Sequence, residues 1–207
     1  MIPSITIITP ITNDRLRIHR DRMIEMVRNQ KCKLIMQHLF EVDDGERSIG
    51  EKLNAMIDRG HGQIIIRMDS DDHYSTFYIQ HAVDTLLKHD KQTIVGLSSC
   101  FFYDQLTNKA WEYTWNDISQ RLVLGATQAF YKDSGFRYPE TINHPKTGEV
   151  LNHGEDNVFC SQFPKVVYGD YKEHFVAIKH GRNTSPYNFR DSCYEPANVE
   201  YVKSLMK

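Results

Sequence analysis

Several features that mark particular classes of protein are missing from this sequence. Its four cysteines lie far apart and form no CxxC pair, which argues against a zinc knuckle or a redox-active dithiol. We therefore expect reduced thiols at Cys32, Cys100, Cys160 and Cys193, as in a cytosolic protein. No stretch approaches the roughly 18 consecutive apolar residues of a membrane span. The apolar start MIPSITIITP lacks the basic segment of a signal peptide, so we predict a cytoplasmic protein without a membrane span.

A surplus of charge of one sign is also missing. The chain has 25 lysines and arginines against 27 aspartates and glutamates, which gives a formal net charge of −2. Domains dedicated to nucleic acids usually have a pI above roughly 9, so the overall charge does not favour a nucleic-acid partner. With 207 residues, the chain is long enough for one domain with a substantial core. Basic residues nevertheless gather in one predicted helix, at Arg15, Arg17, Arg20, Arg22 and Arg28.

Strand and helix patterns alternate through the first half of the chain. Residues 5–9, ITIIT, are β-branched throughout, which is typical of a short strand buried on both faces. Alternation of strands and helices predicts a mostly parallel sheet covered by helices. The predicted strands are 5–9, 33–42 and 63–68, and the predicted helices are 14–30, capped by Asn13 or Asp14, 50–62, and 75–90, capped by Ser75.

The second half of the chain is richer in strands. The segment from 100 to 115 predicts core residues plus a β-hairpin, with Asn108 in its turn. The predicted strands are 93–104, 109–115, 121–131, 165–170 and 174–180, and a short helix is predicted at 154–163.

Polar segments follow the first three predicted strands: TPITND at 9–14, VDDG at 42–45 and MDSDD at 68–72. In a parallel sheet the carboxyl ends of the strands lie at one edge, where ligands bind, so these segments should meet in one crevice. In an extended segment, Asp69 and Asp71 would turn both carboxylates toward one ion. Oxygen ligands of this kind suit Mg²⁺ or Mn²⁺ together with a diphosphate. Each motif alone is more often a turn or a helix cap, and it is their convergence that favours a nucleotide–metal site.

At this point the residues resemble a known family, the nucleotide-sugar glycosyltransferases of the GT-A fold, family 2 type. The resemblance runs from about Ile5 to Ser185, and its segments follow the family's order. It implies an α/β, GT-A (Rossmann-like) fold: a mostly parallel central sheet flanked by helices, with a smaller antiparallel acceptor-side sheet. It also implies a single domain over 1–207, with a nucleotide-binding half at 1–92 and an acceptor or catalytic half at 93–207. The matching segments are ITIITPITN, EVDDG, GEKLN, IIIRMDSDD, LVLGATQAF, GEDNVF and IKHGRNTS.

The resemblance implies roles for residues that bind the donor. Thr9 and Pro10 match the loop that cups the uracil of the nucleotide with main-chain groups. Thr12 stands where the family usually has a tyrosine that stacks on the uracil, a departure that leaves the identity of the base open. Asp44 matches the carboxylate that accepts a hydrogen bond from the N3–H of the base. The remaining donor-binding matches, near the ribose and the diphosphate, are Lys52, Asn54 and Asp69.

The resemblance also implies the metal-binding and catalytic residues. Asp69 and Asp71 match the DxD pair that touches ribose and metal, and His180 matches a late histidine that completes the metal site or, in some members, meets the diphosphate. Glu155 and Asp156 match the ED pair, in which the aspartate is the catalytic base that takes the proton of the acceptor hydroxyl. We expect Asp156 to lie at the start of a helix, where the dipole lowers its pKa and keeps it ionised. The metal stabilises the charge that develops on the leaving diphosphate.

We therefore predict an enzyme: a metal-dependent, inverting glycosyltransferase that moves a hexose or pentose from a UDP-sugar to an acceptor hydroxyl, with Mn²⁺ or Mg²⁺ as cofactor. A glycan is the expected acceptor, with Trp111 and Trp115 as candidate contacts, and His73 and His153 lie beside the acidic motifs. One alternative acceptor is a modified base of phage-type DNA, which would have to leave the base stack. An alternative of another class is a non-catalytic nucleotide-sugar-binding module, against which the presence of both DxD and ED argues. Nucleotidyl transfer is disfavoured because TPITNDR lacks a glycine-rich phosphate loop.

Overall fold

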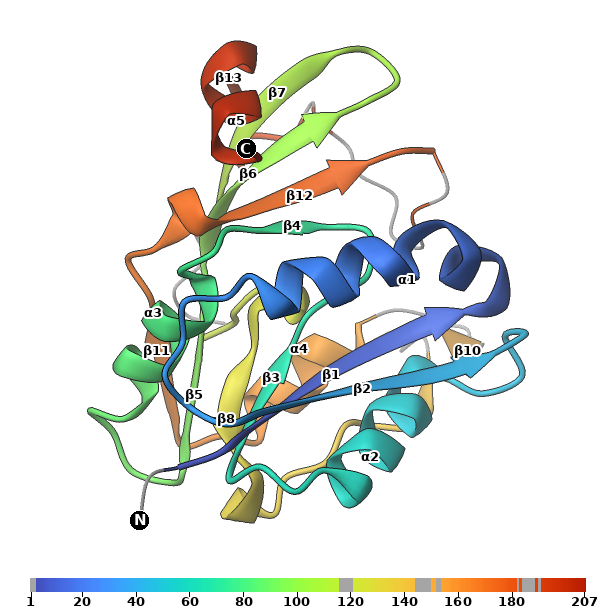
Figure 1. The fold of residues 1–207 in the computed structure, drawn as a ribbon, viewed down its shortest axis with the longest axis vertical. Coiled ribbons are helices and arrows are strands. Elements are labelled where there is room, and N and C mark those ends of the chain that lie inside the picture. Colours follow the sequence, from blue (N-terminus) through green and yellow to red (C-terminus); the bar gives the residue numbers. More distant parts are fainter. Residues whose placement is uncertain are drawn as a thin grey trace.

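A computed structural model of the chain (Figure 1) describes residues 3–115, 121–143, 150, 151, 154–181, 183, 189 and 191–207. All structural statements concern these residues. Of the sequence predictions above, those on His153 and on the last segment's Arg182, Thr184 and Ser185 lie outside them.

The larger sheet has six strands in the order β11-β5-β8-β3-β1-β2. The parallel neighbours β2, β1 and β3 come from the first half of the chain, and β8 lies antiparallel between β3 and β5. The prediction of a mostly parallel central sheet is therefore confirmed. The bounds are β1 Ile5–Thr12, β2 Met36–Asp43, β3 Ile64–Arg67, β5 Thr93–Gly96, β8 Ala129–Tyr131 and β11 Lys165–Tyr168.

Helices cover both faces of this sheet, which explains why its central strands carry apolar residues at successive positions. Ile5 and Ile7 of β1 belong to a core with side chains of α1 and α3, whereas Ile8 belongs to a second core with side chains of α2 and α4. The predicted flanking of the sheet by helices is confirmed. The bounds are α1 Asn13–Arg28, α2 Ile49–Arg59, α3 Tyr78–Leu86 and α4 Glu155–Ser161.

A second sheet has five strands in the order β13-β7-β6-β12-β4, and α5 (Val199–Leu205) packs against it through Val202. Its neighbours are antiparallel except for the parallel pair of β6 and β12, so the sheet is mixed where we predicted an antiparallel one. Its strands are β4 His73–Tyr74, β6 Ser99–Asp104, β7 Lys109–Thr114, β12 Phe175–Lys179 and β13 Tyr194–Ala197. The remaining short elements are η2 Gly125–Thr127, η3 Lys132–Ser134, β9 Ile142–Asn143, β10 Val150–Leu151 and η4 Lys172–His174.

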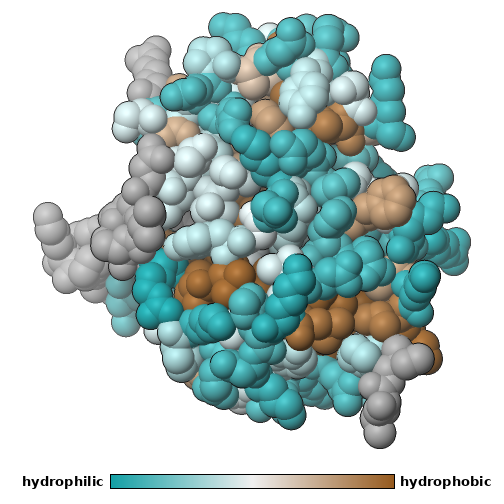
Figure 2. All heavy atoms as spheres, turned by 90° about the vertical axis from the view of Figure 1, so that its left-hand side faces the viewer, coloured by the Kyte–Doolittle hydropathy of each residue, from teal (hydrophilic) through white to brown (hydrophobic). Residues whose placement is uncertain are grey.

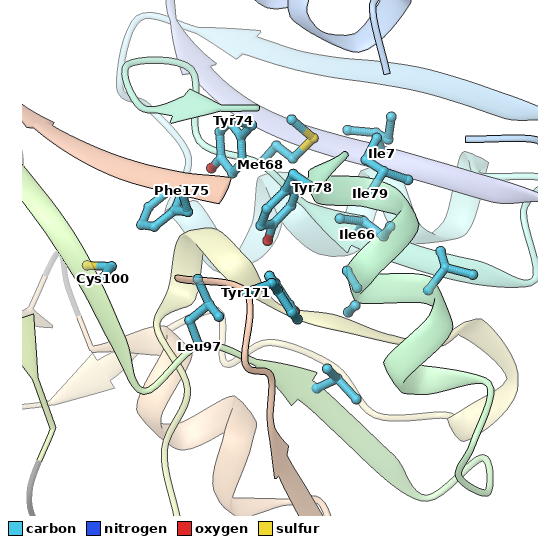
Figure 3. Close-up of a cluster of buried hydrophobic side chains, with 14 of the residues drawn as sticks. Ile7, Ile66, Met68, Tyr74, Tyr78, Ile79, Leu97, Cys100, Tyr171 and Phe175 are labelled. Atoms are coloured by element: carbon cyan, nitrogen blue, oxygen red, sulfur yellow. The ribbon is translucent and has the colours of Figure 1, made fainter. Parts of the chain in front are cut away.

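Aromatic residues join the two sheets. Tyr74 of β4 lies 4.8 Å from the ring of Tyr78 in α3 and 5.1 Å from that of Phe175 in β12, measured between ring centroids. Figure 3 shows these rings beside Ile7 and Ile66 of the larger sheet. Edge-to-face and tilted ring contacts add to the stabilisation from burial, so the cluster fixes the second sheet against the first.

Some sequence-predicted boundaries are wrong. The predicted strand at 121–131 is a 3₁₀ turn, η2, followed by the short β8, and the predicted strand at 93–104 divides into β5 and β6, which belong to different sheets. Thr12, and neither Asn13 nor Asp14, is the N-cap of α1, and Phe77 takes the position predicted for Ser75 at the start of α3. The sequence patterns predicted neither β13 nor α5. The hairpin turn at Asn108 is confirmed, with a φ of 51°.

The face of the molecule that lies on the left in Figure 1 is mostly polar. Figure 2 shows that hydrophilic residues cover most of the face on the left of Figure 1, with apolar side chains exposed in separate areas. Within the described ranges, no helix combines the length and the apolar character needed to cross a membrane.

Candidate functional site

The three polar segments meet at one edge of the larger sheet, as predicted, because β2, β1 and β3 are parallel neighbours. A cavity of about 490 Å³ opens there. Its lining combines charged side chains with apolar side chains of the second sheet, among them Phe102 and Ala177. Seven predicted site residues line the cavity and four do not. The seven are Pro10, Thr12, Lys52, Asp69, Asp71, Glu155 and Asp156, and the four are Thr9, Asp44, Asn54 and His180.

The carboxylates of Asp69 and Asp71 bind different partners. Arg67 donates from Nε to Asp69 Oδ1 at 2.9 Å and from Nη2 to Asp69 Oδ2 at 3.3 Å. Asp71 Oδ2 lies 2.9 Å from His180 Nε2 and 3.5 Å from Arg15 Nη1. The segment forms a turn after β3 and not an extended strand, so the argument from alternating side chains does not apply to it. That both carboxylates face one ion stays a prediction.

His180 reaches Asp71 from the end of β12. Asn183 fixes this end of the strand, because its Oδ1 accepts from the backbone N–H of His180 at 2.9 Å and its Nδ2 donates to the Ile178 carbonyl at 2.8 Å. The ring of His19, in α1, lies 5.7 Å from the His180 ring. His180 therefore lies beside the DxD turn, and its role at a metal or a diphosphate stays a prediction.

Asp72 ties the same turn to the second sheet. Its side chain is buried and accepts from the backbone N–H of Ile178 at 2.9 Å, and its carbonyl accepts from Arg22 at 2.6 Å. Burial, together with the charges of Asp71 and Asp69, raises the pKa of Asp72 well above its usual value. Asp72 therefore acts as a structural anchor for the turn.

Arg67, the last residue of β3, connects the DxD turn with α4. In addition to its bonds with Asp69, it donates from Nη1 to Glu155 Oε1 at 3.0 Å, and only 5% of the residue is exposed. Its guanidinium carbon lies 5.9 Å from the centroid of the Tyr138 ring. Charged groups are buried at a cost unless they are paired, and the two carboxylates supply that pairing.

Asp156 lies at the first turn of α4, after Gly154, which adopts a left-handed φ of 92°. Burial first, and the neighbouring Glu155 second, raise the pKa of Asp156, while Arg67 lowers it. The expectation that the helix dipole lowers this pKa below its usual value is therefore wrong, because desolvation outweighs it. A carboxylate with a raised pKa is a better proton acceptor, which suits a general base.

Gly125 of η2 has no side chain, and the Asp156 carboxylate lies where a side chain at this position would be. A Cβ at this position would lie 2.7 Å from Asp156 Oδ2 and 3.2 Å from Arg67 Nη1. Any larger residue would therefore displace one of these two charged groups.

A buried hydrogen-bond network that includes Gln128 and Tyr138 holds the start of α4 in place. Gln128, which is fully buried, donates from Nε2 to the Asp156 carbonyl at 3.4 Å and accepts from the Tyr138 hydroxyl at 2.5 Å. Asn54 in turn donates to the Tyr138 carbonyl and accepts from the Tyr138 N–H, both at 3.0 Å. The structure thus places Asn54 in this network and does not bring it to the cavity wall.

Another acidic pair, Asp43 and Asp44, lies where β2 ends and the following loop begins. Asp43 accepts from Lys52 Nζ at 3.1 Å and from the Gly45 N–H at 2.8 Å. These bonds lower the pKa of Asp43 despite burial, which acts in the opposite direction. Asp44, the predicted base-binding residue, is exposed and accepts from Asn13 Nδ2 at 2.6 Å, so it ties this loop to the start of α1.

The β1–α1 corner holds the remaining predicted donor residues. Thr9 is buried, and its Oγ1 lies 3.0 Å from Nε2 of His38 in β2. Pro10 and Thr12 line the cavity, and the Thr12 hydroxyl donates to the Asp14 carboxylate.

Sequence reasoning missed Arg67, Arg15 and Asp43. Arg67 carries a usable signal, since a charged residue that ends an isoleucine strand needs a buried partner. The cavity wall includes neither Trp111, which stacks on Phe189 with ring centroids 3.9 Å apart, nor Trp115, nor His73. The four cysteines are free, as expected.

A divalent cation fits part of this site. In the described part of the chain, no three histidine, cysteine, aspartate or glutamate side chains gather as a preformed metal site. Asp71 and His180 nevertheless supply one carboxylate and one imidazole within 2.9 Å of each other. Mg²⁺ is commonly held by one or two carboxylates plus substrate phosphates, and Asp71 supplies one such carboxylate. Asp69 is less available, because both of its carboxylate oxygens bind Arg67.

Comparisons with known proteins identify the fold. No protein-family model matches the sequence, and no curated protein matches it either. Among solved structures, S. aureus TarS 1–349 in complex with UDP-GlcNAc has a TM-score of 0.55 at 15% identity, covering 89% of this chain and 62% of that one. The same protein in complex with UDP has a TM-score of 0.52 at 15% identity, covering 84% and 60%. The chain therefore spans about 60% of the TarS 1–349 chain, and what the two share is the α/β fold.

Proposed function

We propose that the protein is a glycosyltransferase that moves a sugar from a UDP-sugar to an acceptor hydroxyl. The observation that carries this proposal is that one cavity of about 490 Å³ is lined by Asp69 and Asp71 as well as by Glu155 and Asp156. These two acidic pairs lie far apart in the sequence, and Arg67 binds one carboxylate of each. The resemblance of the sequence motifs to family 2 glycosyltransferases, and the UDP-GlcNAc and UDP complexes of TarS, support a nucleotide sugar as donor.

Basic and acidic groups at the sheet edge would bind the donor. Lys52 is 4% exposed and lines the cavity together with Pro10 and Thr12, so these residues would hold the nucleotide. Asp69, oriented by Arg67, would accept hydrogen bonds from donor hydroxyl groups. Asp71 and His180 would hold Mn²⁺ or Mg²⁺, which would stabilise the negative charge of the leaving diphosphate. Arg15, 3.5 Å from Asp71, adds a second positive charge near the same point.

Asp156 would act as the general base. Its raised pKa favours uptake of the proton from an acceptor hydroxyl, and the attack would come on the face of the sugar opposite the diphosphate. Such a displacement inverts the configuration at the anomeric carbon. Apolar residues of the second sheet, among them Phe102, line the same cavity and would contact the sugars.

Turnover and donor binding can be separated experimentally. The protein is incubated with a panel of UDP- and GDP-sugars in Mn²⁺, Mg²⁺ or EDTA, and nucleotide release and calorimetric binding of UDP are measured. Asp156→Asn should lower release by a factor of roughly 100 to 10,000 and leave UDP binding unchanged. Asp133→Asn, a surface variant that loses only an ion pair with Lys91, is the matched control. Binding without release from any donor would instead point to a strict requirement for the acceptor or to a non-catalytic binding module, and absence of UDP binding would refute the proposal.

A further inference from the structure

Arg67 occupies an unusual position for a charged residue. It ends β3 after three buried isoleucines, and the residue is only 5% exposed. A buried ion pair contributes little net stability compared with apolar residues of similar volume, because desolvation offsets the attraction. Its placement therefore calls for a reason other than stability.

The partners of Arg67 come from two functional motifs. Asp69 is two positions away in the DxD turn, whereas Glu155 is 88 positions away at the start of α4. The planar guanidinium group presents several N–H donors in a fixed fork, so one side chain can hold two carboxylates in a defined relative geometry. Lysine, as a point charge on a flexible chain, cannot reproduce this arrangement.

The backbone and ring contacts of Arg67 limit its movement. Its backbone N–H donates to the Gln128 carbonyl at 2.9 Å, and the side chain of Gln128 donates to the Asp156 carbonyl at 3.4 Å. The guanidinium group lies over Tyr138, whose hydroxyl donates to the same Gln128. Arg67 and Asp156 are thus held by one buried scaffold.

We propose that Arg67 is a positioning residue that fixes the donor-side carboxylate Asp69 and the acceptor-side pair Glu155–Asp156 in one rigid geometry. The inference rests on the proposed function and extends it, since it explains how donor binding and acceptor activation share one alignment. Holding both reactants in the correct relative geometry raises the reaction rate by large factors, and small displacements lower the rate correspondingly.

The test compares three variants of the complete chain: Arg67→Lys, which keeps the charge, Arg67→Gln, which removes it, and Gln30→Leu. Gln30 is buried and does not line the cavity. It donates to the Ser75 carbonyl at 2.7 Å and accepts from the Ile79 N–H at 3.0 Å. Its variant therefore controls for lost stability. Thermal unfolding identifies a temperature at which all variants are folded. Two readouts follow: calorimetric binding of UDP-GlcNAc with Mn²⁺, and the carbon-13 NMR titration of the Asp156 carboxyl, assigned with Asp156→Asn.

Arg67→Gln should raise the titration midpoint of Asp156 by about one unit, because a nearby positive charge is lost. Arg67→Lys should leave that midpoint near the wild-type value but weaken UDP-GlcNAc binding about tenfold, because Asp69 loses its bidentate partner. Gln30→Leu should change neither quantity.

The outcomes separate this inference from the proposed function. A folded Arg67→Gln variant with a wild-type Asp156 midpoint would overturn the inference, and so would a folded Arg67→Lys variant with wild-type binding of UDP-GlcNAc. If Arg67→Gln fails to fold, the binding loss in Arg67→Lys decides. If the wild-type protein binds neither UDP-GlcNAc nor UDP, the proposed function fails, while the NMR titration still reports whether Arg67 acts on Asp156.

Discussion

His180 Nε2 lies 2.9 Å from Asp71 Oδ2, although 109 positions separate the two residues in the chain. The contact joins the turn after β3 of the larger sheet to the end of β12 in the second sheet. A carboxylate and an imidazole so arranged can share a divalent cation with the phosphates of a nucleotide.

Asp71→Asn should therefore remove the effect of Mn²⁺ on nucleotide binding. We expect the affinity for UDP in Mn²⁺ to fall at least about tenfold, to the value that wild-type protein shows in EDTA. Calorimetric titration of UDP with and without Mn²⁺ measures this. Asp133→Asn should bind as wild type does. If Asp71→Asn retained the enhancement by Mn²⁺, the cation would have to be held elsewhere.

Gly125→Ala should impair catalysis more than stability. The new Cβ would lie 2.7 Å from Asp156 Oδ2, so the carboxylate must move, and such a displacement costs roughly tenfold to 100-fold in rate. Release of UDP from the donor is the measurement. Gly135→Ala is the control, because its φ of 81° makes alanine unfavourable by roughly 1 kcal/mol while no atom lies within 4 Å of the added Cβ. Equal loss of rate in both variants would indicate a general effect of destabilisation.

Two buried tyrosines offer a matched pair of variants. The Tyr74 hydroxyl accepts from the Asp69 N–H at 2.7 Å and donates to the Ala126 carbonyl at 2.9 Å, whereas within the described residues the Tyr78 hydroxyl is buried without a hydrogen-bond partner. Tyr74→Phe should cost about 1–3 kcal/mol of unfolding free energy, because it leaves polar groups unsatisfied. Tyr78→Phe should be neutral or stabilising. Urea unfolding of both variants tests this, and a larger loss in Tyr78→Phe would contradict the hydrogen bonding described above.

His38 should make the protein less stable in acid. Burial lowers the pKa of His38 from 6.5 to about 4, so between these values the unfolded chain binds a proton that the folded protein does not. Stability contributed by the neutral ring is complete above pH 6.5 and is lost as the pH falls toward 4. Linkage gives a loss of about 2 kcal/mol between pH 7.5 and pH 5.

Urea unfolding at these two pH values measures the loss. In His38→Gln the difference between them should shrink by about that amount, whereas replacing the exposed His61 by glutamine should not change it. An unchanged pH dependence in His38→Gln would show that other groups cause the acid sensitivity.

Local sequence patterns predicted the layered fold because its main determinants are local. The β-branched run at 5–9 forms a strand only when both faces are covered, and the helical patterns beside it supply those covers. The chain from 121 to 131 was misread because Thr127 stops the strand pattern through its own hydrogen bonds. Its hydroxyl accepts from the Leu97 N–H at 2.9 Å and donates to the Leu124 carbonyl at 2.8 Å, which bends η2 before β8 begins.

The sequence predicted which residues form the site more fully than it predicted the interactions between them. Spacing in the sequence indicated Asp69 and Asp71. The contact of Asp71 with His180 and the bond of Arg67 to Glu155 are tertiary contacts that no short pattern encodes. The same holds for Asp156, because its helix position is local whereas its burial is not. A lowered pKa follows from the dipole alone, and the raised pKa follows once Glu155 and the surrounding desolvation are included.

The insertion of β8 between β3 and β5 has a consequence for how the chain matures. Ile64–Ile66 of β3 pair on one side with β1, and on the other side only with residues 129–131. During synthesis this isoleucine edge is complete long before its partner leaves the ribosome, and open apolar strand edges recruit other chains. The nascent protein therefore passes through a stage at which chaperone binding would protect it from self-association, and that stage ends when β8 docks.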